Sequence, residues 1–180
     1  MKDRIYIGNR AYYANIQLLK NKLINRNLKV TIYKTLIRPV ITYGAEVWTM
    51  SKTEEETMRR FERKVIRKIY GPTKRNDNWV LRTNEEINNI LGDEDIIRFI
   101  KSQRIRWLGH VQRMEGGRMP KRVLTERLYS SRKRGRPTSR WIDNIVNDLR
   151  RLKVKRWWEV ANDRVRWRHI VEEAKAHKEL

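Results

Sequence analysis

Two groups of carboxylates have the residue types that metal-dependent chemistry at a phosphodiester would need. Asp93, Glu94 and Asp95 are consecutive, and Asp143 and Asp148 lie five residues apart. Such chemistry requires carboxylates that converge on the metal ions. The first three lie where the N-terminus of a helix favours negative charge, and residues five apart on a helix do not share a face. We therefore predict no catalytic residue and no enzyme activity for this chain alone.

The pattern of metal-ligating residues predicts neither a metal site nor a cofactor. The three histidines, His110, His169 and His177, lack the i, i+4 spacing of a helical metal site, and the chain has no cysteine. We expect His110, which follows a glycine on a tryptophan-bearing helix, to be packed or hydrogen-bonded. The absence of cysteine also excludes disulfides and thiol catalysis.

The most informative segment for function is the basic stretch 130–140, which reads Ser-Ser-Arg-Lys-Arg-Gly-Arg-Pro-Thr-Ser-Arg. Arginines that flank a glycine and a proline can lie extended and enter a narrow, negative minor groove of DNA, and the segment resembles the core of an AT-hook. General attraction to phosphates and an inert solvated linker are the alternatives. The expected nucleic-acid-binding residues are Arg132, Lys133, Arg134, Gly135, Arg136, Pro137 and Arg140.

The charge of the chain points to a polymeric anion as its partner. The 180 residues carry 43 Lys+Arg against 21 Asp+Glu, a formal charge of +22. Such an excess repels itself in a compact state unless an anion is bound. Residues 101–170 hold 21 basic and 6 acidic side chains, whereas residues 1–100 hold 20 and 12. We therefore expect the binding face in the C-terminal half.

Nucleic acid is the expected polyanion, as DNA, RNA or an RNA–DNA hybrid. A membrane surface is the rival, but no segment approaches the roughly 18 apolar residues of a membrane span, and the basic stretches lack a wide apolar face. No membrane partner is therefore predicted, and the Met1 end does not resemble a secretory signal. The expected location is intracellular, in the nucleus or a ribonucleoprotein particle.

Apolar residues recur at helical spacing almost throughout, which predicts an all-α multi-helix bundle with a basic Gly/Pro linker and a C-terminal helical hairpin. Ser51 or Thr53 can cap one helix, and Thr83 with Glu86 forms a capping box for another. Pro39 is expected to kink the helix that contains it. The core must be built from amphipathic helices, because 36% of the residues are charged.

Three further elements follow from the same pattern. The helical hairpin is expected over 141–176, around a turn at 153–155. The polar stretch from Gly71 to Asn78 is expected to be a loop. A first helix is marked by Ile16, Leu19 and Leu23.

Four Arg-Trp dipeptides allow two interpretations. Tryptophan beside arginine can stack on bases next to phosphate contacts, or the tryptophan can be buried while the arginine faces water. The helical spacing favours burial. The four tryptophans are Trp107, Trp141, Trp157 and Trp167.

Short motifs along the chain resemble, in the right order, the part of non-LTR (LINE-type) retrotransposon reverse transcriptases that follows the palm. No single motif is diagnostic, but together they span nearly the whole chain. They are Tyr-Gly-Ala-Glu-Val-Trp at 43–48, preceded by 33–40, then 61–65, 106–111, Gly-Arg-Pro at 135–137 with 140–143, and 163–168.

The resemblance implies a thumb and C-terminal extension without polymerase chemistry. The palm aspartates that hold two metal ions are absent, so the activity is not carried over. The implied organisation is thumb-like helices at 1–50, a helical connector region at 51–129, the basic linker at 130–140 and the helical hairpin at 141–176. In the family the thumb grips the template–primer duplex.

Three hypotheses stay open from the sequence. The chain is a noncatalytic nucleic-acid-binding fragment, or an accessory part of an RNA-directed DNA polymerase that acts only with a palm from another chain, or a helical relic without function. The first is favoured by the charge, the basic linker and the resemblance.

Overall fold

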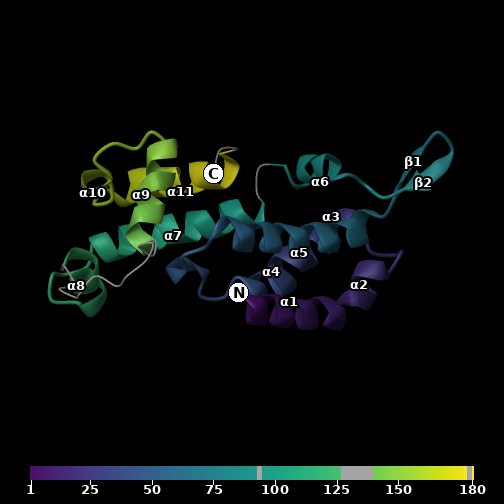
Figure 1. Cartoon of the computed structure of the whole chain (residues 1–180), viewed down its shortest axis with the longest axis horizontal. Helices are drawn as coiled ribbons and strands as arrows, with labels where there is room; N and C mark the ends of the chain where they lie inside the picture. The colour runs from purple at the N-terminus through teal and green to yellow at the C-terminus, as the bar shows by residue number, and fades with distance from the viewer. Residues whose placement is uncertain (93–94, 127–139, 178–179) are drawn as a thin grey trace, which may run out of the picture. The chain divides into compact units, whose positions relative to one another are not determined.

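The structure, a computed structural model, describes residues 1–92, 95–126, 140–177 and 180. It forms two compact units (Figure 1). Unit 1 comprises Met1–Tyr43 and Met50–Ile97, and unit 2 comprises Gly44–Thr49 and Arg98–Leu180. The expected all-α class is confirmed, since helices dominate the described residues and the two short strands form one small sheet.

In its described residues, unit 1 has six α-helices and a π-helical stretch that precedes α4. Its buried residues come from every one of these helices, and the largest fully buried side chains of the unit include Tyr33, Ile37 and Met58. The elements are α1 (Lys2–Ala14), α2 (Ile16–Lys20), α3 (Arg26–Ile32), the π-helical Tyr33–Ile37, α4 (Arg38–Ile41), α5 (Lys52–Tyr70) and α6 (Asn84–Leu91).

Local signals in the sequence set the ends of α5 and α6. Ser51 accepts from the backbone of Glu54, whose carboxylate accepts from the Ser51 backbone in return, so the first turn of α5 has its free N–H groups satisfied. Thr83 and Glu86 form the second capping box, as expected. Gly71 ends α5 with a φ of 70°, a conformation that favours glycine.

The helix that contains Pro39 is distorted just before the proline. Its N-terminal part, α3, is followed by the π-helical stretch Tyr33–Ile37 and then by α4. Pro39 cannot donate to the preceding turn, so this is where the regular ladder is broken. α1 packs closely on α4, because a Cβ at Gly8 would lie 2.9 Å from Cδ1 of Ile41.

Two elements of unit 1 differ from the expectation. The helix marked by Leu23 ends at Lys20, and Leu23 itself is exposed. The longer α1, which precedes it, was not predicted, since only Gly8 and Tyr12 of that helix are buried and its apolar periodicity is weak.

The expected loop from Gly71 to Asn78 is instead the first strand and the turn of a β-hairpin that ends at Val80. Strands β1 (Thr73–Arg75) and β2 (Asn78–Val80) are antiparallel, and Thr73 pairs with Val80. The intervening Asn76 and Asp77 both have positive φ, 46° and 62°. Two consecutive residues of positive φ are typical of the type I′ turn, which matches the twist of a hairpin.

Unit 2 packs helices around a long central helix, α7. Its core joins Ile105 and Leu108 of α7 to Ile145 and Leu149, and the far wall includes Trp167. The first two residues of α7 belong to unit 1. The elements are the 3-10 turn Ala45–Val47, α7 (Ile96–Gln112), α8 (Met119–Thr125), α9 (Trp141–Arg151), α10 (Trp157–Val160) and α11 (Arg164–Ala176).

The C-terminal part is not a simple two-helix hairpin. The turn after α9 lies where it was expected, with Lys153 at a φ of 57°. The second helix is broken, however, because Asp163 caps a new helix: its Oδ1 accepts from the backbone N–H groups of Val165 and Arg166. The cap separates the short α10 from α11.

The two units group the chain differently from the four expected segments. α5 and α6, from the expected connector region, share unit 1 with α1 to α4. None of the helices in the described part of the chain is long and apolar enough to span a membrane.

We predict that Gly109→Ala destabilises unit 2. A Cβ at Gly109 would lie 2.0 Å from Nε1 of Trp167, which is buried and donates to the Ile105 carbonyl at 3.0 Å. Because the extra methyl group would crowd a buried, hydrogen-bonded side chain, we expect a loss of about 1–3 kcal/mol in the free energy of unfolding.

Urea unfolding followed by circular dichroism measures this loss. Gly116→Ala is the matched control, because a Cβ there meets nothing within 4 Å. Equal unfolding midpoints for the two variants would contradict the packing of Trp167 on Gly109.

Candidate nucleic-acid interface

Of the expected binding residues, only Arg140 falls within the described part of the chain. It is exposed and directly precedes α9, with an extended backbone at φ −76° and ψ 147°. Arg132, Lys133, Arg134, Gly135, Arg136 and Pro137 lie outside the described residues. Their role therefore stays a prediction.

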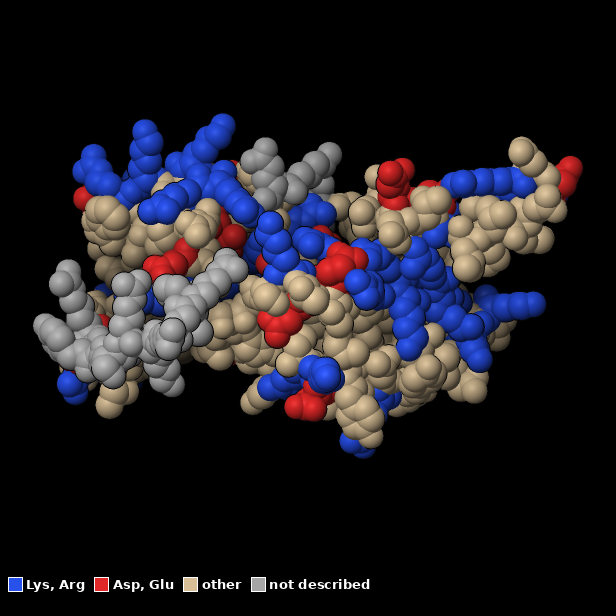
Figure 2. Space-filling view, in the orientation of Figure 1, with Lys and Arg blue, Asp and Glu red and all other residues tan. Residues whose placement is uncertain are grey.

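A row of exposed cations follows one face of α5 in unit 1. Arg60, Lys64 and Lys68 are spaced four residues apart, which places them on the same side of a helix. Figure 2 shows Lys and Arg side chains gathered over the C-terminal half of α5. We call these three residues the α5 cation row.

Tyrosine rings lie beside the centre of the α5 cation row. Nζ of Lys64 is 4.8 Å from the ring centroid of Tyr12 and 4.9 Å from that of Tyr13, within the range of a cation–π contact. The same Nζ donates to Oδ1 of Asn9 at 2.9 Å. Tyr13 is 58% exposed. The surface thus presents an exposed tyrosine with a positioned ammonium group over its ring.

The outward face of α1 continues this surface. Tyr6, Arg10 and Tyr13 are spaced at i, i+4 and i+7, and all three are exposed, Tyr6 at 66%. Exposed aromatic side chains interleaved with cations can stack on bases while the cations contact phosphates. We call Tyr6, Arg10 and Tyr13 the α1 stripe.

Other cations of unit 1 are bound to partners within the unit. Nε of Arg59 lies 3.4 Å from Oδ2 of Asp95. Arg67 donates to the carbonyl of Arg82 and to the side chain of Asn84. Within the α5 cation row, Nε of Arg60 lies 3.8 Å from Oε1 of Glu56, and the Arg60 side chain is 72% exposed. Such exposed pairs contribute little and leave the cation available.

Unit 2 has a cleft at the C-terminal end of α7, made of two recesses that share His110 and Arg113. The first recess has a volume of about 630 Å³, and the second about 490 Å³. Besides the shared pair, Met114, Glu115, Arg118 and Arg164 line the first recess, and Glu46, Gln103, Arg106 and Trp107 line the second. We call the two recesses together the α7 cleft.

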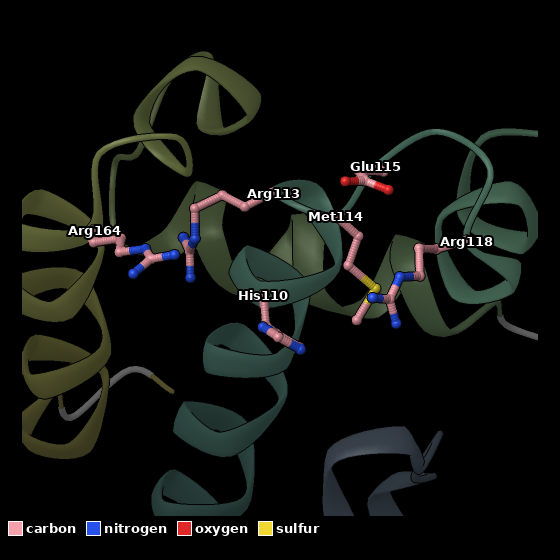
Figure 3. A pocket seen from close by; sticks show the side chains of 6 residues that line it. All are labelled: His110, Arg113, Met114, Glu115, Arg118 and Arg164. Atoms are coloured by element: carbon pink, nitrogen blue, oxygen red, sulfur yellow. The ribbon is translucent and has the colours of Figure 1, made fainter.

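Arginines approach the first recess from both sides of His110 (Figure 3). The guanidinium groups of Arg113 and Arg164 face one another, and Arg118 comes from the opposite side. Arg113 is held in place because it donates to the carbonyl of Ala161. Burial, and then the charge of Arg164, lower the pKa of Arg113. Two like charges held this close favour an anion between them.

His110, which was expected to be packed or hydrogen-bonded, is exposed. Its ring lies 5.2 Å from that of Trp107, at a tilt of 43°. Of the Arg-Trp tryptophans, Trp107 lines a recess, whereas Trp167 is buried in the core, as the spacing favoured. The indole of Trp141 donates to the carbonyl of Glu46.

The three candidate acids that the structure describes lie in different surroundings. Asp95 is paired with Arg59, Asp143 is exposed, and Asp148 is buried with Oδ1 3.5 Å from Nζ of Lys101. Burial raises the pKa of Asp148, and Lys101 opposes the rise. Asp93 and Glu94 lie outside the described residues. Among the residues that are described, no three His, Asp or Glu side chains gather as metal ligands would.

Glu62 is the most strongly perturbed acid, and its contacts are structural. Its carboxylate accepts from the hydroxyl of Tyr33 and from the backbone N–H of Ile96, each at 2.8 Å. It therefore joins the π-helical stretch to the first residue of α7. Burial raises the pKa of Glu62 to about 7, while the two hydrogen bonds oppose the rise.

Comparison with known proteins gives one relative to report. It is an uncharacterized transposon-derived protein of Caenorhabditis elegans, 25% identical over 180 residues. The match covers 95% of this chain and 64% of the relative, so the chain spans less than two thirds of that protein. Neither a protein-family model nor a solved structure matches the chain. The similarity supports a transposon-related origin.

We predict that Glu62 makes the stability of the fold depend on pH. The folded protein holds the Glu62 proton more tightly than the unfolded chain, whose carboxyl titrates near the ordinary 4.5. Stability therefore falls as pH rises from about 4.5 to about 7 and is level above that range. Glu62→Gln mimics the protonated acid, so it should remove up to about 3 kcal/mol of this dependence.

Denaturant unfolding of both proteins at pH 5, 6, 7 and 8 gives the comparison. The stability of wild type relative to Glu62→Gln should decline across the series. Parallel pH profiles would show that Glu62 is ionised in the folded protein throughout.

Proposed function

We propose that the chain is a noncatalytic nucleic-acid-binding protein of transposon origin. The observation that carries the proposal is the α5 cation row beside the exposed ring of Tyr13. Exposed cations at one-turn spacing can each neutralise a phosphate, and the released counterions drive binding without sequence preference. Arg140 and the rest of the basic linker add cations in the same chain.

Nucleic acid fits this surface better than an acidic protein does. An acidic peptide needs the cations, but it has no use for the exposed tyrosines of the α1 stripe. Unpaired bases or the open end of a duplex can stack on such rings, and base–aromatic stacking contributes roughly 1–3 kcal/mol per base. The described charges offer no arrangement for base-edge readout, so we expect weak sequence preference.

The resemblance to non-LTR retrotransposon reverse transcriptases makes the proposal more specific. It suggests that unit 1 corresponds to the thumb side of such an enzyme and that an RNA–DNA hybrid is among the ligands. The transposon-derived relative supports this direction. Under this proposal the chain would act with a palm that another polypeptide supplies, and primer extension by that palm should rise when the chain is added.

We predict that Lys64→Gln with Lys68→Gln weakens binding and its dependence on salt. If six to ten phosphates are neutralised, wild-type affinity should fall about a thousandfold or more between 50 and 200 mM salt. Loss of two phosphate contacts should lower the slope of log K against log salt by about 2 on duplex DNA. Fluorescence anisotropy with duplex DNA, RNA–DNA hybrid and single strands measures both quantities.

The matched control is Lys22→Gln with Lys155→Gln, which removes the same charge from exposed lysines outside α1 and α5. The control should keep the wild-type slope of log K against log salt to within the value for one phosphate contact. If both double variants lose the same affinity, net charge rather than this surface determines binding. A salt-insensitive wild-type complex would contradict the proposal itself.

A further inference from the structure

We propose that the α7 cleft of unit 2 is a separate site for one unpaired nucleotide of a single strand. The first recess would hold its phosphate, and the second would hold its base. This inference rests on the proposed function only in that the ligand is nucleic acid. None of the residues that line the α7 cleft belongs to the α5 cation row.

The first recess has the chemistry of a phosphate site. Arg113, Arg118 and Arg164 line it together with a single carboxylate, that of Glu115. Guanidinium groups bind phosphate oxygens in a paired, planar geometry, which makes arginine the preferred residue for such sites. In the described part of unit 2 no carboxylate is seen to pair with these three arginines.

Two arginines of the first recess come from fixed parts of unit 2. The bond from Arg113 to the Ala161 carbonyl fixes one guanidinium. Arg164 is the first residue of α11, whose start is fixed by the Asp163 cap. The mutual repulsion of Arg113 and Arg164 is relieved when an anion binds between them, so the recess favours a phosphate over water.

The second recess has aromatic side chains in its lining. Trp107 and His110 form an aromatic wall, and Arg106 and Gln103 supply hydrogen-bond donors at its side. Trp107 is half-buried, so its ring is held by the fold while part of it faces the recess. Every base has a π-face, so such a wall accepts bases with little preference.

The shared residues set the distance between phosphate and base. His110 and Arg113 line both recesses, so the two recesses are adjacent and one ligand can reach both across this pair. A nucleotide can do so, with a phosphate at one end and a base at the other. A base inside a duplex is stacked on its neighbours and cannot reach the wall, which favours a single strand.

The test compares single strands with duplex for two neutralising double variants. Arg118→Gln with Arg164→Gln removes cations from the first recess. Arg150→Gln with Arg166→Gln removes exposed cations from α9 and α11 outside the cleft and serves as the control. For a single strand, the cleft variant should lower the salt slope by about 0.7, the value for one phosphate. The slope should change much less for the control variant on a single strand, and for the cleft variant on duplex DNA.

The base contact is tested with Trp107→Leu and a strand of abasic sites of equal length. Loss of stacking on one base should weaken binding to oligothymidine about fivefold to a hundredfold, and should leave binding to the abasic strand unchanged. Circular dichroism melting checks that the variant is folded. In wild type, the Trp107 indole N–H signal, assigned by its disappearance in the variant, should shift when oligothymidine is added.

The results separate this site from the proposed function. If the α5 variant loses affinity while the cleft variants match their control on single strands, nucleic-acid binding holds and the cleft site is overturned. An unmoved Trp107 signal at saturating oligothymidine also overturns it. If the cleft variant loses single-strand affinity while the α5 variant does not, the cleft stands and the α5 surface fails.

Discussion

The excess of cations over carboxylates is the constraint on which the rest of this structure depends. With 43 Lys+Arg and 21 Asp+Glu, the chain cannot pair every cation internally. Several of its carboxylates are used inside the fold: Glu62 holds the start of α7, Asp148 lies buried beside Lys101, and Asp163 caps α11. The cations on the surface repel one another. This repulsion is limited where they are well separated and solvated, or where a polyanion neutralises them.

The surplus cations are organised rather than scattered. In unit 1 they follow the outward face of α5 beside the tyrosines of α1, and in unit 2 they line a cleft whose walls include an aromatic pair. These two arrangements suit different features of nucleic acid, since a row of cations follows a backbone and a cleft takes a single group. A nucleic acid with a paired and an unpaired part could use both arrangements, with the paired part on the α5 cation row of unit 1 and the unpaired part in the α7 cleft of unit 2.

The sequence predicted best the features that are decided within a few residues. The capping boxes of α5 and α6, the glycine that ends α5 and the turn after α9 follow from local chemistry, and the all-α class follows from helical periodicity. The hairpin was missed because its Asn-Asp turn lacks the glycine that usually signals one. α1 was missed because it buries little apolar surface.

The candidate site was harder to predict because its parts are distant in the sequence. Arg113 and Arg164 meet through tertiary packing, and no spacing rule relates them. Lys64 reaches the rings of Tyr12 and Tyr13 across more than 50 residues. The sequence does contain one signal for the α5 cation row. Arg60, Lys64 and Lys68 recur every four residues, which predicts a basic face on a helix. The basic linker, in contrast, is visible in the sequence because its cations lie close together along the chain.

The central claim is that exposed cations and rings on this fold meet nucleic acid. Ultraviolet crosslinking of the intact protein to a hybrid carrying a single-stranded tail, followed by mass spectrometry of the peptides, tests it most directly. The account predicts crosslinks in peptides that contain Tyr13 and Lys64 and, from the tail, in the peptide that contains Trp107. Saturating ligand that leaves all of these peptides unmodified would contradict it.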